Sequence, residues 1–205
     1  MMKRMPLLLS RTALAAMVVS FAGCANVSGP LVGGSNVQYG DARAVETVSN
    51  EFGSTDLQTI AESMARSLLQ ARVITNSRDT PMVTISEVQN KTSEYIDTRT
   101  ITDKIRVQLQ KSGSVRFPIN ANEMQGQVDE LTRQNQTGLY KKSGAAKIGK
   151  MEGAKYRIQG SISSIVKRNA NIKDVFYTFQ LSLVNIESGV IEWADEKDIR
   201  KTSTR

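Results

Sequence analysis

Apolar residues recur at helical spacing in two stretches of the chain, residues 56–70 and 101–113. Each stretch places its large aliphatic side chains three or four positions apart, which predicts an amphipathic helix with one face on a core. Asp56 is the candidate N-cap of the first helix, and Gly113 is the candidate C-cap of the second. A more polar segment, residues 122–134, predicts a third helix. The apolar positions of the first two helices are Leu57, Ile60, Ala61, Met64, Leu68, Ile101, Ile105 and Leu109.

Alternating apolar and polar residues, which are typical of half-buried strands, dominate the last quarter of the chain. Residues 155–167, 175–186 and 190–199 each show this pattern, and their close succession predicts an antiparallel meander. Earlier, the β-branched residues of 81–89 predict a strand, and the proline in 115–120 limits that segment to an edge or a strand end. The order of these elements predicts an α/β (α+β) fold, in which a mixed sheet of four to five strands is flanked by helices.

The first 23 residues have the pattern of a signal peptide, with a basic start and small residues before Cys24. Their apolar core, residues 12–22, is shorter than the roughly 20 residues that a membrane-spanning helix needs. The "FAGC" ending resembles the bacterial lipobox, and Asn26 resembles the residue at this place in lipoproteins sent on to the outer membrane. We therefore expect a covalent lipid on Cys24 that anchors the chain to the outer membrane, facing the periplasm.

Residues 24–55 are rich in Gly, Ser and Asn, a composition that predicts a flexible linker. A coil of about 30 such residues reaches roughly 30 Å. Residues 56–205 are expected to form the folded domain. The second part of the linker is a less obvious tether, because Tyr39 and Phe52 offer apolar side chains that can dock onto the domain or a partner.

The composition excludes most catalytic and metal-binding chemistry. The chain has no His and a single Cys, so it lacks the commonest general base, the commonest metal ligand and an internal disulfide. Residues 144–150 match the start of a phosphate-binding loop, but Met151 stands where Ser or Thr would ligate Mg²⁺. We interpret this segment as a small-residue helix packed close to the sheet. We expect neither an enzyme nor any cofactor besides the lipid.

Positive charge gathers in one segment, residues 141–157, which holds six basic residues and one acidic residue, Glu152. Removal of the signal peptide takes away three basic and no acidic residues, so the net charge falls from +7 to +4. The basic segment would attract an acidic protein face, an anionic glycan or lipid headgroups. The export signal argues against nucleic acid, and a solvated surface is the plain alternative.

Several phrases of the sequence, taken in order, resemble the penicillin-binding protein activator LpoB family over roughly residues 38–200. The resemblance implies an outer-membrane lipoprotein with a fold like the N-terminal domain of TolB. It also implies a monomer that contacts a class A bifunctional penicillin-binding protein and stimulates glycan polymerisation and crosslinking. This linker is shorter than the Pro-rich tethers of well-known activators. The phrases are "YGDA", "FGSTDLQ", "NKTSEYIDT", "DKIRVQLQKSG", "DELTRQNQTGL" and "IESGVIEW".

Three polar segments are candidates for the contact with a partner. The first is the loop "NKTSEY", for which the alternative is that Asn90 and Thr92 cap the next helix. The second is "ELTRQ", and the third is a pair of lysines. The candidate contact residues are Asn90, Lys91, Thr92, Glu94, Tyr95, Glu130, Gln134, Lys141 and Lys142.

Two other functions compete with synthase activation. An assembly or secretion lipoprotein of the outer membrane would form a ring with membrane-inserting strands of about 9–11 residues, and only residues 175–186 approach that pattern. A glycan hydrolase or a passive peptidoglycan binder would act on or pellet with isolated sacculi without a partner protein.

Overall fold

The computed structural model describes residues 40–204. The signal peptide and Cys24 lie outside the described residues, so the predictions for them stay predictions. The elements, in chain order, are α1 (Ser54–Gln70), α2 (Arg72–Thr75), β1 (Val83–Ile85), β2 (Gln89–Lys91), α3 (Thr98–Lys111), the 3-10 helix η1 (Ala121–Glu123), α4 (Met124–Gln136), β3 (Tyr156–Arg168), β4 (Ile172–Asn185) and β5 (Ile191–Thr204).

The strands form one five-stranded mixed sheet in the order β1-β3-β4-β5, and β2 also pairs with β3. Both short strands run parallel to β3, whereas β3, β4 and β5 form the predicted antiparallel meander. The predicted strand over 81–89 is divided in two, because residues 86–88 leave the sheet between β1 and β2. Residues 115–120 contribute only an isolated bridge between Arg116 and Met82. The predicted fold class is confirmed.

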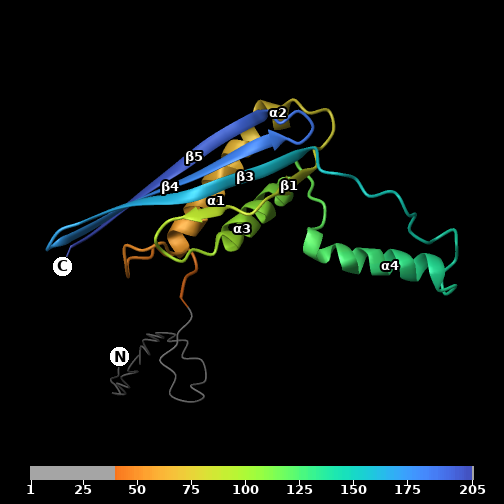
Figure 1. Ribbon diagram of the computed structural model, residues 1–205, viewed down its shortest axis with the longest axis horizontal. Helices are drawn as coiled ribbons and strands as arrows, with labels where there is room; N and C mark the ends of the chain where they lie inside the picture. Colours follow the sequence, from red (N-terminus) through yellow and green to blue (C-terminus); the bar gives the residue numbers. More distant parts are fainter. Residues whose placement is uncertain (1–39, 205) are drawn as a thin grey trace, which may run out of the picture. The chain divides into compact units, whose positions relative to one another are not determined.

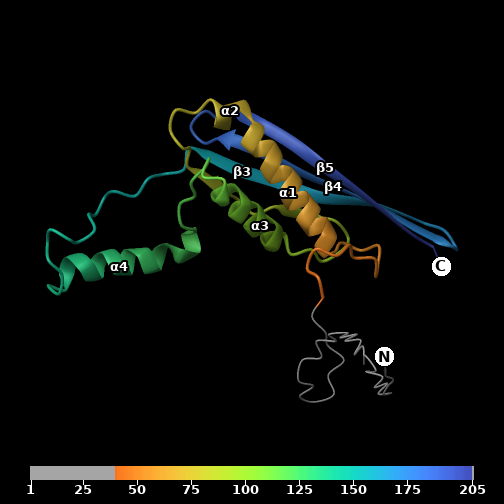
Figure 2. The ribbon, with the colours of Figure 1, turned by 180° about the vertical axis from the view of Figure 1, so that it is seen from behind.

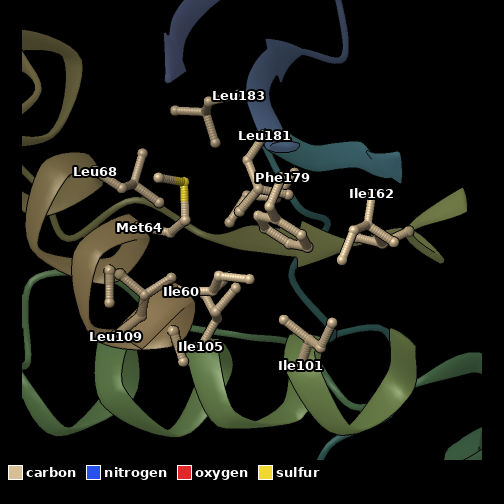
Figure 3. Close-up of a cluster of buried hydrophobic side chains, with 14 of the residues drawn as sticks. Ile60, Met64, Leu68, Ile101, Ile105, Leu109, Ile162, Phe179, Leu181 and Leu183 are labelled. Carbon is tan, nitrogen blue, oxygen red and sulfur yellow. The ribbon is translucent and has the colours of Figure 1, made fainter. Parts of the chain in front are cut away.

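Helices α1 and α3 lie side by side on the same face of the sheet (Figure 1 and Figure 2). Their apolar faces meet the inward side chains of β3 and β4, as Figure 3 shows for the centre of the core. Burial of each large apolar side chain contributes roughly 1.5–3 kcal/mol, which makes this layer the main source of stability. The largest fully buried side chains are Ile60, Met64, Leu68, Val83, Ile101, Ile105, Leu109, Ile158, Ile162, Tyr177, Phe179 and Leu183.

The predicted helix starts and ends need one correction. The N-cap of α1 is Gly53 rather than Asp56. Asp56 lies three residues further on, where its carboxylate accepts a hydrogen bond from the Gly53 N–H at 2.8 Å. Asp56 therefore still satisfies a backbone donor at the helix start, but it does so from a position three residues after the N-cap. Gly113 follows α3 with a φ of 70°, as expected for a C-terminal glycine.

The segment that resembles a phosphate-binding loop is not the small-residue helix that we expected. Residues 144–150 consist of turns and irregular backbone, and Gly149 has a φ of 78°. Two of these seven residues are Gly, which is unfavourable in a helix interior because it loses the most backbone freedom. The strand–loop–helix context that phosphate binding requires is missing from this segment.

Gly160 allows β3 and β4 to approach each other closely. A Cβ atom at this position would lie 2.0 Å from the Gln180 carbonyl oxygen and 2.7 Å from Leu181 Cδ2. The clash with the Gln180 oxygen involves backbone, which has little freedom to yield in the middle of a paired sheet.

We therefore expect Gly160→Ala to lower the free energy of unfolding by about 1–3 kcal/mol, measured by denaturant unfolding. Gly126→Ala in α4 is the matched control, because nothing lies within 4 Å of a Cβ at that position. This control should be neutral or slightly stabilising. Equal destabilisation by the two substitutions would contradict the close approach of β3 and β4.

Candidate functional site

Glu94 fixes the loop between β2 and α3 to the rest of the domain. Its carboxylate accepts hydrogen bonds from the Phe52 N–H at 3.0 Å and from the Tyr177 hydroxyl at 2.7 Å. The Tyr177 ring is fully buried and meets the edge of Phe52 at 5.9 Å between ring centroids. Burial, and then the hydrogen bond to Glu94, raise the pKa of Tyr177, so this hydroxyl stays a donor. Glu94, which we selected as a partner contact, thus has an internal structural role.

A second anchor holds the residues just before α1 onto β4 and β5. The Lys201 ammonium donates to the Glu51 carbonyl oxygen at 2.6 Å and to the Asp56 carboxylate at 3.0 Å. The Asn50 side chain donates to the Lys173 carbonyl oxygen at 3.0 Å. The Asp56 and Lys201 side chains are only 6% and 16% exposed, so solvent screens this ion pair weakly.

These contacts extend the folded part of the chain beyond its expected start. The compact unit begins at Asp41, whereas the sequence pattern placed the end of the linker at residue 55. Within this stretch the Glu46 carboxylate accepts from the Ser54 N–H at 2.6 Å, and the Gln58 side chain donates to the Ala42 carbonyl oxygen at 2.6 Å. The docking that Phe52 suggested is therefore present, and it shortens the available linker.

Sequence reasoning missed Lys201 and Asn50 as members of this junction. Lys201 follows Ile199 by two positions on β5, so both side chains point to the face covered by the helices. A basic residue at such a position, on a strand with a covered face, needs an acidic partner. The alternation of side chains along β5 could therefore have identified Lys201, but its acidic partner, Asp56, lies 145 residues away in the sequence.

The loop of residues 90–95 is closed by its own hydrogen bonds. The Asn90 side chain donates to the Glu94 carbonyl oxygen at 2.8 Å and accepts from the Thr92 N–H at 2.9 Å. Neither residue caps α3, because the N-cap is Asp97, which accepts from the Arg99 N–H at 3.0 Å.

Two of the five predicted contact residues of this loop point outward without a hydrogen bond inside the described chain. Lys91 is exposed, and Tyr95 is 95% exposed. An aromatic side chain that is so exposed on a closed loop has a large contact area and little ordering entropy left to lose. The structure therefore narrows the first candidate segment to Lys91 and Tyr95.

Glu130 and Gln134, the second candidate pair, connect α4 to the chain that returns from it. The Glu130 carboxylate makes a two-pronged contact with the Arg133 guanidinium, at 2.7 Å to each oxygen. Hydrogen bonds from Gln134 and then Arg133 hold the pKa of Glu130 below its ordinary value. Gln134 also accepts from the Ala146 N–H at 2.9 Å, which holds that part of the chain beside the helix.

An apolar groove follows from this arrangement. It lies between α4 and the returning residues and encloses about 330 Å³. No residue of α4 is buried, so these apolar side chains are not used by the core of the domain. Ile148 and Met151 are 64% and 52% exposed at the rim. The lining residues are Val128, Leu131, Thr132, Ile148, Gly149 and Met151.

Four lysines of the segment that returns from α4 have no carboxylate partner within residues 40–204. Lys141 and Lys142, the third candidate pair, are exposed, as are Lys147 and Lys150, and none of them takes part in an ion pair within residues 40–204. The one acidic residue of the segment, Glu152, pairs with Arg116 at 2.8 Å. The groove and its lysines together, which we call the α4 surface, suit an acidic surface with an apolar side chain at its centre.

No group of three or more acidic or cysteine side chains in residues 40–204 is placed to hold a metal ion. None of the described helices is long and apolar enough to cross a membrane. What the fold does offer is a rigid domain with an exposed tyrosine loop and a basic, partly apolar surface beside α4.

A sequence model described as peptidoglycan-synthase activator LpoB matches residues 56–199. The chain therefore belongs to the LpoB family of peptidoglycan-synthase activators, and it is a regulatory protein rather than an enzyme. The resemblance noted in the sequence is confirmed. A comparison with curated protein sequences found no match.

Solved structures of the same family are similar to the chain at low identity. The LpoB C-terminal domain from Salmonella enterica is 21% identical, with 71% of this chain and 99% of that chain covered and a TM-score of 0.43. The same domain from Escherichia coli is 22% identical, with the same coverage and TM-score. The NMR structure of E. coli LpoB is 19% identical, with 98% and 96% covered and a TM-score of 0.36.

The role of Glu94 leads to a stability prediction. Glu94→Ala leaves the buried Tyr177 hydroxyl and the Phe52 N–H without their acceptor, so the free energy of unfolding should fall by about 1–3 kcal/mol in denaturant titrations. Glu94→Gln keeps one acceptor oxygen and should lose less. Glu87→Ala, at an exposed glutamate of the same region, is the control and should change stability little. Equal stability of the two alanine variants would refute the structural role of Glu94.

Proposed function

We propose that this protein is an outer-membrane lipoprotein that binds and activates a class A bifunctional penicillin-binding protein. Its binding to the synthase would stimulate both glycan polymerisation and peptide crosslinking. Membership of the peptidoglycan-synthase activator family is the observation that carries this proposal. The chain would act as a monomer, without a cofactor other than the lipid on Cys24 and without nucleic acid.

The route of the chain to its partner follows from the N-terminal sequence. A signal peptide of 23 residues and a lipid on Cys24 would hold the protein to the inner surface of the outer membrane. Because the compact unit begins at Asp41, about 16 residues would remain as a tether. Fully extended, they span at most roughly 55 Å. We therefore propose that the synthase domain recognised by this protein extends far toward the outer membrane.

We propose two contact surfaces on the domain. The first is the loop of residues 90–95, where Tyr95 would be the aromatic anchor and Lys91 a peripheral charge. The second is the α4 surface, where Lys141 and Lys142 would steer an acidic face of the synthase to the groove. Buried aromatic anchors dominate many interfaces, whereas charges at the rim mainly increase the association rate.

The proposal predicts stimulation in a reconstituted reaction. The soluble chain from residue 25 onward should raise glycan polymerisation and crosslinking by at least one purified class A synthase of the same organism. Tyr95→Ala should raise the concentration needed for half-maximal stimulation about tenfold or more, because loss of an aromatic hot spot costs about 2 kcal/mol or more of binding free energy. Lys141→Ala with Lys142→Ala should have a smaller effect, which should disappear at high salt.

Gln110→Ala, at an exposed position of α3, is the control and should stimulate like the unchanged protein. Unchanged rates for every class A synthase would disprove the activator role in this organism. Stimulation that is insensitive to both the Tyr95 and the lysine substitutions would leave the activator role standing but refute the proposed surfaces.

The anchor has its own test. Cys24→Ser removes the sulfur that would carry the lipid, so the protein should leave the outer-membrane fraction while its domain stays folded. The measurement is membrane fractionation together with the circular dichroism spectrum of the purified variant. If the serine variant still fractionates with outer membranes, the assignment of Cys24 is wrong.

A further inference from the structure

The sheet has a second face, which α1 and α3 leave open (Figure 1 and Figure 2). Side chains that alternate with the buried residues of β3, β4 and β5 point to this face. The strand register places them in rows across the sheet. Three neighbouring rows are made of amides, hydroxyls, carboxylates and one alanine. They are Gln159–Ser182–Ala194, Ser161–Gln180–Glu196 and Ser163–Thr178–Asp198.

Small side chains hollow the first two of these rows into a trough. One hollow of about 510 Å³ lies over β3, β4 and β5. A second hollow of about 430 Å³ lies where residues 86–88 leave the sheet between β1 and β2. The two hollows are continuous, because they share lining residues. The shared residues are Gln159, Gly160, Ser161 and Ser182.

The hydrogen-bonding groups on the floor of the trough are largely uncommitted within the protein. The side chains of Gln159 and Ser161 make no hydrogen bond within residues 40–204. Gln180 donates to Glu196 at 3.1 Å, and the Ser182 hydroxyl donates to the Gln159 carbonyl oxygen at 3.5 Å. A side-chain amide offers two donors and an acceptor, and a hydroxyl offers both roles. The floor thus suits a ligand with many hydroxyl and amide groups of its own.

The charges around the trough distinguish between ligand classes. The Glu196 carboxylate lies on its β5 side and would repel nucleic acid, phospholipid headgroups or an acidic peptide, whereas the Asp195 side chain points to the face covered by the helices. Lys91 and Arg157 line the opposite end together with one acidic residue, Glu87, and none of the three takes part in an ion pair within the described residues. A mainly neutral polymer with an occasional carboxylate complements this pattern of charge.

Two apolar residues border the polar rows, in a row that ends in Arg200 on β5. Ile165 and Phe176 lie opposite each other in the register, one row beyond Ser163 and Thr178, and Ile165 is 61% exposed. Sugar rings combine hydroxyl edges with an apolar face, so a polar floor beside an apolar ledge matches their chemistry.

We propose that this trough binds a strand of N-acetylated glycan that carries carboxylate groups, the chemistry of the polymer made by peptidoglycan synthases. Gln159 and Gln180 bind the acetamido and hydroxyl groups, while Lys91 and Arg157 meet the carboxylates. Apart from Lys91, which lies at the edge of both, the residues of this surface lie outside the proposed synthase contacts, so it would let the protein hold the synthase and the glycan product at the same time.

The test is a titration of the soluble chain from residue 25 onward, followed by heteronuclear NMR. The probe is a linear hexamer of β-1,4-linked N-acetylglucosamine, and a β-1,4-linked glucose hexamer is the comparison without acetamido groups. Signals of Gln159, Ser161 and Gln180 should shift with the first hexamer and much less with the second. Gln159→Ala with Gln180→Ala should weaken binding about tenfold, since two hydrogen bonds are lost.

The matched control is Gln70→Ala with Gln110→Ala, which removes two exposed glutamines from α1 and α3 and should leave binding unchanged. Ala194→Trp, at an exposed position of β5, fills the trough and should also abolish the shifts. Absence of shifts in the trough, equal shifts with both hexamers, or unchanged binding by the Gln159 and Gln180 variant would overturn the proposal. Because the Gln159 and Gln180 variant should still stimulate a synthase, failure of the glycan site is distinguishable from failure of the activator role.

Discussion

Packing of α1 and α3 against a single face of the sheet is the constraint on which the rest of the structure depends. The large buried side chains of the described chain come from these two helices and from the inner face of the strands, as Figure 3 shows. Residues 40–204 hold no comparable set of buried apolar residues for a second layer. The outer face of the sheet and α4 are therefore left to solvent or to partners, and binding surfaces can differ in chemistry without disturbing the core.

The junction around Glu94 connects the N-terminal segment to one of those surfaces. A single carboxylate oxygen accepts from the Phe52 N–H, just before α1, and from the buried Tyr177 hydroxyl on β4. The next residue along is Tyr95, which is almost fully exposed. Glu94 therefore fixes both the segment just before α1 and the candidate contact loop. The domain presents that loop in one geometry, which lowers the entropy cost of binding.

The sequence predicted most of the secondary-structure elements, but it did not predict the contacts between them. The period of Ile60, Met64 and Leu68 predicted α1, and the alternation around Phe179 predicted β4, because both are local patterns. The roles of Glu94 and Lys201 were missed because their partners lie 42 to 150 residues away. Of the candidate contact residues, Lys91, Tyr95, Lys141 and Lys142 are exposed without a described ion pair, whereas Glu130 and Gln134 are used within the α4 region.

The central claim is that a rigid domain docks through surfaces outside its core. Hydrogen–deuterium exchange of the protein, measured with and without its synthase, tests this claim most directly. The account predicts slower exchange in residues 90–95 and 139–151 on binding, with the amides of α1 unchanged. Protection confined to α1 and α3, or no protection at any segment under saturating synthase, would contradict it.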